Sequence, residues 1–166
     1  MNILITGKPG IGKTTLIQKV AAGHRNLCGF FTKEIRENRK RVGFAIETMD
    51  GRKGVLAHVS IKSPFRVSKY GVNLKDIDEV CVPSLSMEGC LIIIDEIGKM
   101  ELFSEKFKQK VEEALDTGRV VATVMEQSHP FTDKIKRRKD VKVFVLTEDN
   151  RNELVNTVKM KSELDL

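Results

Sequence analysis

The chain has 166 residues, of which 40% are hydrophobic and 31% charged, with a formal net charge of +6 at pH 7. This length favours a single domain over residues 1–166, long enough to bury about 70% of its unfolded surface. No apolar run approaches the ~20 residues that span a bilayer, and the N-terminus lacks the layout of a signal peptide. We therefore expect a cytoplasmic monomer with no membrane partner.

The first segment of the chain predicts a strand, a glycine-rich loop and a helix. The strand is expected over residues 2–6, and apolar residues on one face indicate a helix over 14–22. Between them lies the pattern G-x-x-x-x-G-K-T, a P-loop whose backbone N–H groups bind phosphate. The residues expected to bind nucleotide are Gly7, Lys8, Pro9, Gly10, Ile11, Gly12, Lys13, Thr14 and Thr15.

The residue types in this loop suit a nucleoside triphosphate. Glycines permit the positive φ angles that turn consecutive N–H groups toward phosphate oxygens. Lys13 supplies a positive charge for the β- and γ-phosphates, and the Thr14 hydroxyl can bind Mg²⁺. The helix that begins near Gly12 adds the positive end of its dipole. The loop thus predicts a triphosphate ligand and Mg²⁺ as the cofactor.

The next segment favours an antiparallel meander. Three strands are predicted, over residues 29–35, 42–48 and 55–59. Their connections are a basic turn and the hairpin signal Asp50-Gly51, and short connections of this kind join antiparallel strands. Residues 60–72 are polar and predict no regular structure. Asn73 can cap a short helix, which Pro83 should end or kink.

The second half of the chain alternates strands with helices. Strands are predicted over 91–94, 120–125 and 141–146, and a short helix over 131–137. Ser104 can cap a helix that ends before Gly118, and Thr147 can cap a C-terminal helix. This alternation predicts a mainly parallel sheet with helices on both faces. The expected fold is an α/β three-layer sandwich of the P-loop NTPase type, extended by the antiparallel meander.

An acidic pair, Asp95 and Glu96, follows the apolar strand at 91–94. Ligands of open α/β sheets bind at the carboxyl ends of the strands, and the P-loop emerges from the same edge. Asp95 is therefore expected to hold Mg²⁺ opposite Thr14. Glu96 is expected to orient and deprotonate an attacking water, which favours hydrolysis over transfer to another acceptor. The alternatives are a turn cap for Asp95 and a surface charge for Glu96.

The sequence around this pair resembles a known family. Residues 95–102 read D-E-I-G-K-M-E-L, and further matches occur at residues 29–32, 67–73, 138–141 and 150–151. By these motifs the chain resembles the thermophilic and cancer-related nucleoside-triphosphatases, which are small P-loop proteins. The resemblance covers essentially the whole chain. It implies Mg²⁺-dependent cleavage of the γ-phosphate from ATP, GTP and other triphosphates, with broad base tolerance and slow turnover.

Further candidates for the site are two arginines and a threonine. Negative charge on the transferring phosphoryl group calls for a cation besides Lys13. Arg138 and Arg151 fall where the resemblance repeats an arginine. One of them could be an arginine finger or stack on the base, and a surface salt bridge is an equal alternative for each. Thr123 could contact the γ-phosphate through a water, or simply pack within its strand.

The cysteines Cys28, Cys81 and Cys90 lie far apart and form no C-x-x-C pair. Each stands in or beside an apolar segment. We therefore expect three buried thiols, and neither a disulfide nor a zinc site.

Two other functions stay open beside hydrolysis. A phosphotransferase would bind its acceptor between the meander and residues 137–138. A nucleic-acid-dependent switch would use two basic clusters, at residues 36–41 and 134–142, so nucleic acid is a candidate partner. Both clusters lack the interleaved aromatic residues on which bases stack.

Overall fold

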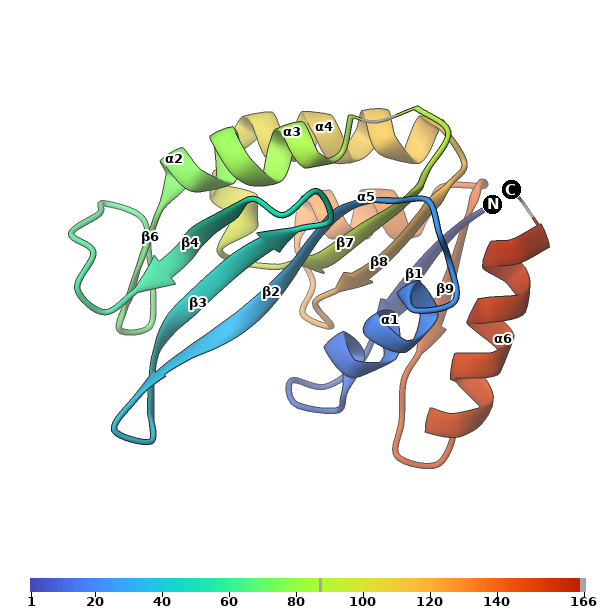
Figure 1. Ribbon diagram of the computed structural model, residues 1–166, viewed down its shortest axis with the longest axis horizontal. Helices are drawn as coiled ribbons and strands as arrows, with labels where there is room; N and C mark the ends of the chain where they lie inside the picture. Colours follow the sequence, from blue (N-terminus) through green and yellow to red (C-terminus); the bar gives the residue numbers. More distant parts are fainter. Residues whose placement is uncertain (87, 165–166) are drawn as a thin grey trace.

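The computed structural model describes residues 1–86 and 88–164, and these residues form one sheet of nine strands (Figure 1). The order across the sheet is β5-β6-β4-β3-β2-β7-β8-β1-β9. The strands are β1 (Asn2–Thr6), β2 (Leu27–Glu37), β3 (Lys40–Thr48), β4 (Lys53–His58), β5 (Arg66–Val67), β6 (Tyr70–Val72), β7 (Leu91–Ile97), β8 (Val120–Val124) and β9 (Val141–Val145).

Strand β2 joins a parallel half of the sheet to an antiparallel half. Its first residues pair in parallel with β7, and β7, β8, β1 and β9 continue the parallel arrangement. From Phe30 onward β2 pairs antiparallel with β3, which begins the meander. The predicted parallel sheet with an antiparallel extension is confirmed.

Helices cover both faces of the parallel half. On one face lie α1 (Lys13–Ala21) and α6 (Arg151–Leu164), and on the other lie α4 (Glu105–Asp116) and α5 (Pro130–Lys136) (Figure 1). Each face has its own cluster of buried apolar side chains. The central strands β1 and β8 are buried along their whole length, as expected for parallel strands between two helical layers. Within the described ranges, no helix has the length and apolar character needed to cross a membrane.

A helical segment with a π-helical middle follows the meander. It consists of α2 (Leu74–Asp76), the π-helix η1 (Ile77–Cys81) and α3 (Val82–Ser84). Asn73 caps it, because its side chain accepts a hydrogen bond from the Asp76 N–H. Pro83 was expected to end or kink the helix. Proline lacks the N–H of an α-helical bond, and the wider π turns lie immediately before it, so the segment continues to Ser84.

Two local expectations are wrong. Residues 60–72 contain a short hairpin, β5–β6, whose turn has Ser68 at a φ of 53°. Helix α6 begins at Arg151 and not directly after Thr147. The Thr147 N–H donates to Asn150 Oδ1 at 2.8 Å, and the Asn150 carbonyl accepts from Leu154, so a turn at 147–150 precedes the helix.

The expectation of three free thiols is also wrong. Cys28 and Cys90 form a disulfide with their Cα atoms 5.9 Å apart, whereas Cys81 is free and buried. The register explains the pairing, because Leu27 of β2 stands beside Leu91 of β7. The two cysteines are separated by 62 residues in sequence, so their contact depends on the order of strands in the sheet.

Candidate active site

The P-loop connects β1 to α1 at the carboxyl edge of the parallel strands. Gly12, in the left-handed conformation with a φ of 109°, directly precedes α1. Gly7 leaves no room for a side chain, because a Cβ there would stand 2.8 Å from the Leu146 carbonyl oxygen. This close approach brings the end of β9 against the start of the loop.

Lys13 lies within the P-loop. Its Nζ donates to the Gly7 carbonyl at 2.8 Å and to the Lys8 carbonyl at 3.2 Å. The ammonium group is therefore held against the loop backbone, where phosphate is expected to bind.

Asp95 and Glu96 lie in a β-bulge of β7. Ile94 pairs with Ala122, but the next pair joins Ile97 to Val124, so β7 contains one extra residue between them. A bulge bends the strand and re-aims its side chains, and bulges are common beside active sites. The sequence predicted that this acidic pair follows the strand, whereas the pair belongs to an irregularity within it.

The Asp95 carboxylate is 1% exposed and accepts hydrogen bonds from three threonines. Its Oδ1 accepts from Thr14 Oγ1 at 3.1 Å and from Thr123 Oγ1 at 2.9 Å. Its Oδ2 accepts from the backbone N and the Oγ1 of Thr32, at 3.3 and 3.4 Å. Burial raises the pKa of Asp95, and these hydrogen bonds partly oppose the rise. The sequence placed Thr32 in a matching motif but gave no sign of this contact.

These oxygen atoms suit Mg²⁺, which prefers hard oxygen ligands. In the part of the chain that the structure describes, no three His, Cys, Asp or Glu side chains form a cluster able to hold a metal. Mg²⁺ does not need such a cluster, because one or two protein oxygens suffice when phosphate and water complete its shell. The adjacent Thr14 hydroxyl and Asp95 carboxylate fit that role.

Glu96 is half-buried, and its carboxyl group makes no hydrogen bond to any of the described residues. Burial raises its pKa, the positive charge of Lys13 lowers it, and the negative charge of Asp95 raises it again. The charges of Lys13 and Asp95 thus both act on a carboxyl group that accepts no hydrogen bond from the described residues.

A third acidic side chain, Glu101, is buried near this pair and was missed by the sequence reasoning. It is 2% exposed, and its Oε2 accepts a hydrogen bond from the Gly98 N–H at 3.2 Å. Burial raises the pKa of Glu101 well above its usual range, and the Glu96 carboxylate raises it further. The sequence signal that could have pointed to Glu101 is its place within the motif D-E-I-G-K-M-E-L at residues 95–102.

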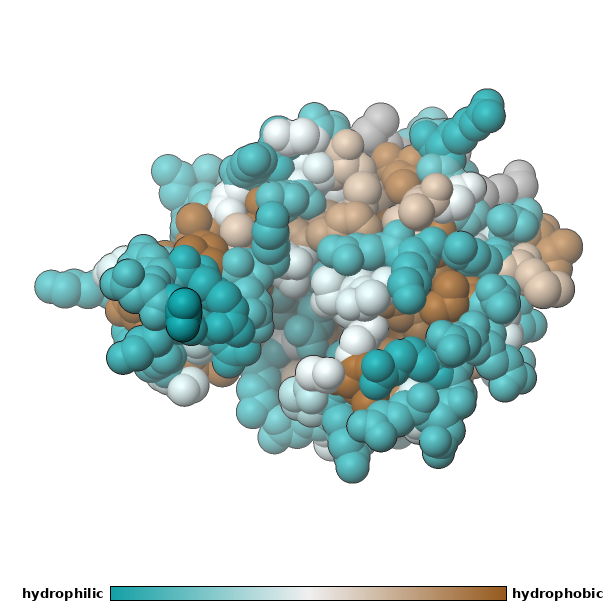
Figure 2. All heavy atoms as spheres, turned by 60° about the horizontal axis from the view of Figure 1, so that its bottom comes forward, coloured by the Kyte–Doolittle hydropathy of each residue, from teal (hydrophilic) through white to brown (hydrophobic). Residues whose placement is uncertain are grey.

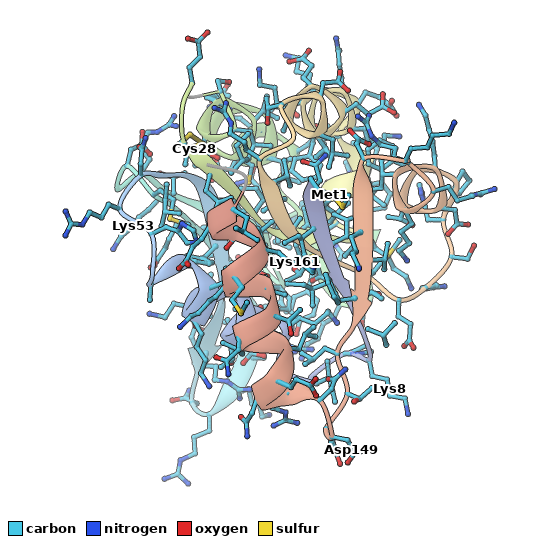
Figure 3. The ribbon with its side chains drawn as sticks, turned by 90° about the vertical axis from the view of Figure 1, so that its right-hand side faces the viewer. Met1, Lys8, Cys28, Lys53, Asp149 and Lys161 are labelled. Carbon is cyan, nitrogen blue, oxygen red and sulfur yellow. A yellow bond between two sulfur atoms is a disulfide. The ribbon has the colours of Figure 1, made fainter. Side chains whose placement is uncertain are left out.

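The structure separates the two candidate arginines. Arg138 precedes β9, at the edge of the sheet opposite the P-loop, and forms ion pairs of 2.8 Å with Asp116 and 2.7 Å with Asp140. Arg151 is exposed at the start of α6, shortly after the end of β9. Figure 3 shows Lys8 and Asp149 at one end of the sheet and Met1 and Cys28 at the other. Only Arg151 therefore shares the P-loop edge.

The two basic clusters also lie at opposite ends of the strands. Residues 36–41 form the tip of the β2–β3 hairpin beyond the carboxyl end of β2, whereas residues 134–142 lie around the amino end of β9. They form no continuous basic surface. In Figure 2, where the lower edge of Figure 1 comes forward, a hollow separates the projecting meander from the rest of the molecule.

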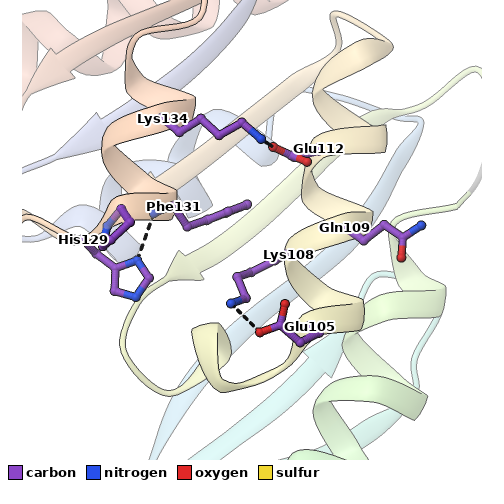
Figure 4. Close-up of a pocket in the computed structure, with 8 residues that line it drawn as sticks. Glu105, Lys108, Gln109, Glu112, His129, Phe131 and Lys134 are labelled. Carbon is purple, nitrogen blue, oxygen red and sulfur yellow. Dashed lines mark hydrogen bonds and ion pairs between the residues drawn. The ribbon is translucent and has the colours of Figure 1, made fainter.

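A separate groove of about 550 Å³ lies between α4 and α5 (Figure 4). The lining residues are Glu105, Lys108, Gln109, Glu112, His129, Pro130, Phe131 and Lys134. Its charges pair with one another, Lys108 with Glu105 at 2.7 Å and Lys134 with Glu112. None of the predicted site residues lines this groove.

Comparisons with known proteins place the chain among relatives of similar length. A family model described as NTPase matches residues 2–159. The chain is 54% identical over 162 residues to nucleoside-triphosphatase THEP1 of Thermotoga sp. (strain RQ2), covering 95% of this chain and 93% of that protein. It is 37% identical over 175 residues to the cancer-related nucleoside-triphosphatase of Homo sapiens, covering 93% and 92%.

Solved structures agree with this similarity. The crystal structure of THEP1 from the hyperthermophile Aquifex aeolicus superposes with a TM-score of 0.88 at 36% identity, covering 98% of this chain and 99% of that one. The solution structure of a human cancer-related nucleoside triphosphatase gives a TM-score of 0.82 at 34% identity, covering 98% and 97%. The expected P-loop NTPase fold is confirmed.

Proposed function

Because the chain belongs to the NTPase family and is a nucleoside-triphosphatase, we propose that residues 7–15 hold the triphosphate while Thr14 and Asp95 hold Mg²⁺. The bound ion neutralises charge on the β- and γ-phosphates. Lys13 adds a second positive charge at the same phosphates. The 3.1 Å contact between the Thr14 hydroxyl and the Asp95 carboxylate supports this assignment.

Glu96 acts as the general base for water. It takes a proton from the attacking water, whose oxygen bonds to the γ-phosphorus while the bond to the bridging oxygen breaks. The products are a nucleoside diphosphate and phosphate. The observation that supports this role is that Glu96 lies in the bulge of β7, where the charges of Lys13 and Asp95 both act on its carboxyl group.

We also propose broad base tolerance, slow turnover and action as a cytoplasmic monomer. The chain has no N-K-x-D sequence of the kind that selects guanine. Arg151 is the remaining candidate for a cation that stabilises the transferring phosphoryl group.

Phosphate release from ATP, GTP, CTP and UTP, with and without Mg²⁺, tests the proposal. Glu96→Gln should bind nucleotide normally and lose about 10²- to 10⁴-fold in turnover, because the base is removed while the shape is kept. Glu153→Gln, an exposed change on α6, is the matched control and should retain wild-type turnover.

Equal turnover in wild type and Glu96→Gln would show that Glu96 is not the general base. If both bind nucleotide but barely release phosphate, a phosphoryl acceptor should be sought instead. Stimulation by RNA or DNA would favour the nucleic-acid-dependent alternative.

A further inference from the structure

Glu101 is a buried acidic side chain that the proposed hydrolysis does not use. It is the first residue of the 3₁₀-helix η2 (Glu101–Phe103), which follows β7. Burying a carboxyl group is unfavourable unless it is hydrogen-bonded, so an apolar side chain would fill this space at a lower cost in stability. The Oε2 of Glu101 accepts such a bond from the Gly98 N–H at 3.2 Å.

That bond forms part of a clamp on the residues that follow Glu96. The carbonyl of Gly98 accepts from the Leu102 N–H at 3.1 Å, so Gly98 is bonded on both sides of its Cα. The carbonyl of Ile97 accepts from the Met125 N–H at 3.1 Å, which ties the same stretch to the end of β8. The backbone just after the β7 bulge is therefore held in one position.

The Glu96 and Glu101 side chains converge on Gly98. A Cβ on Gly98 would stand 3.2 Å from Glu96 Cδ and 3.3 Å from Glu101 Oε2, both closer than ordinary contacts. Gly98 is not among the glycines with positive φ, so space and not backbone conformation explains the glycine. The Glu96 carboxyl thus lies beside Gly98, whose N–H is bonded to Glu101.

We propose that Glu101 is a positioning residue that holds the Gly98 peptide and, through it, the carboxyl group of Glu96 in its place beside the P-loop. This inference rests on the proposed role of Glu96 as the base. Glu101 does not touch the reacting atoms. The positioning role requires an oxygen acceptor at the place of Oε2 and does not require a negative charge.

Three variants and one control test this inference by kcat, KM, nucleotide affinity and melting temperature. Glu101→Gln keeps an oxygen acceptor and should retain kcat. Glu101→Met has similar length without an acceptor, and it should lower kcat about tenfold or more with nucleotide affinity unchanged, because small misplacement of a reacting group is costly. Gly98→Ala should lower kcat similarly by displacing both side chains.

The matched control is Asp78→Asn, which alters a carboxyl bonded to Ser104, the N-cap of α4. This change disturbs Ser104, at the end of the segment that joins β7 to α4, but it does not touch Gly98. It should therefore leave kcat unchanged. In a Glu96→Gln background, Glu101→Met should cause no further loss of turnover, because residues that act through one another are non-additive.

Wild-type kcat in Glu101→Met, an equal loss in Glu101→Gln, or a full additional loss in the Glu96→Gln background would each overturn the inference. If Glu101→Met fails to fold, Gly98→Ala decides, and wild-type kcat in that variant would also overturn it. Failure of the proposed function is distinguishable, because Glu96→Gln alone would then retain its turnover.

Discussion

At the carboxyl ends of the parallel strands, Asp95, Glu96 and Glu101 are buried or half-buried near one another, and burial raises the pKa of all three. At the amino ends of the same strands lie the Cys28–Cys90 disulfide and the ion pairs of Arg138. The carboxyl ends thus hold acidic groups that are unfavourable to bury, whereas the amino ends hold covalent and ionic links. The candidate catalytic groups and the stabilising links therefore lie at opposite ends of the same strands.

The disulfide offers the largest test of this division. Reduction should lower the free energy of unfolding by about 4 kcal/mol, by the chain-entropy estimate for a loop of this length. The rate of phosphate release should stay near that of the oxidised protein, because the bridge lies at the edge opposite the P-loop. Denaturant unfolding of oxidised and reduced protein, each assayed for activity, measures both quantities.

Thiol titration in denaturant is the control for that experiment. The oxidised protein should show one reactive thiol, that of Cys81. Three reactive thiols would show that the bridge does not form, and a large loss of activity on reduction would show that the two edges are not independent.

Local sequence patterns predicted the P-loop, Asp95 and Glu96, because each depends on residues close together in the chain. The strand and helix order followed from the same kind of pattern. The bulge in β7, the Thr32 contact with Asp95 and the disulfide could not be predicted in this way. Each depends on the register between strands that lie far apart in sequence. Glu101 was missed for a related reason, since a charged residue two positions from Lys99 gives no sign that it is buried.

The buried acid at the P-loop edge predicts a pH-dependent cost in stability. The pKa of Glu101 is raised in the folded state, so the folded protein retains a proton that the unfolded chain releases above about pH 4.5. Stability from this group is therefore full below that pH and is lost as pH rises toward the folded-state pKa. Glu101→Gln should remove the loss and melt higher than wild type at neutral and alkaline pH.

Melting temperatures of wild type and Glu101→Gln between pH 4 and pH 9 check this sign. The two curves should meet at the acid end and separate as pH rises. Glu153→Gln, on the exposed surface of α6, should follow wild type throughout. Parallel curves for wild type and Glu101→Gln would show that Glu101 has an ordinary pKa.

The smallest expected effect comes from comparing the two arginines, one at each edge. Arg138→Ala should lower the free energy of unfolding by only about 0.5–1 kcal/mol, because the side chain of its partner Asp116 is largely exposed to solvent and that of Asp140 partly so. Its phosphate release should be unchanged.

Arg151→Ala should leave stability near wild type. As the proposed cation at the γ-phosphate, Arg151 should lower kcat about tenfold when it is removed, which corresponds to ~1.4 kcal/mol of transition-state stabilisation. Denaturant unfolding and phosphate release, measured on both variants, show which arginine contributes to stability and which to turnover. A tenfold loss of turnover in Arg138→Ala would contradict the division, whereas unchanged turnover in Arg151→Ala would remove the remaining candidate for an arginine finger within this chain.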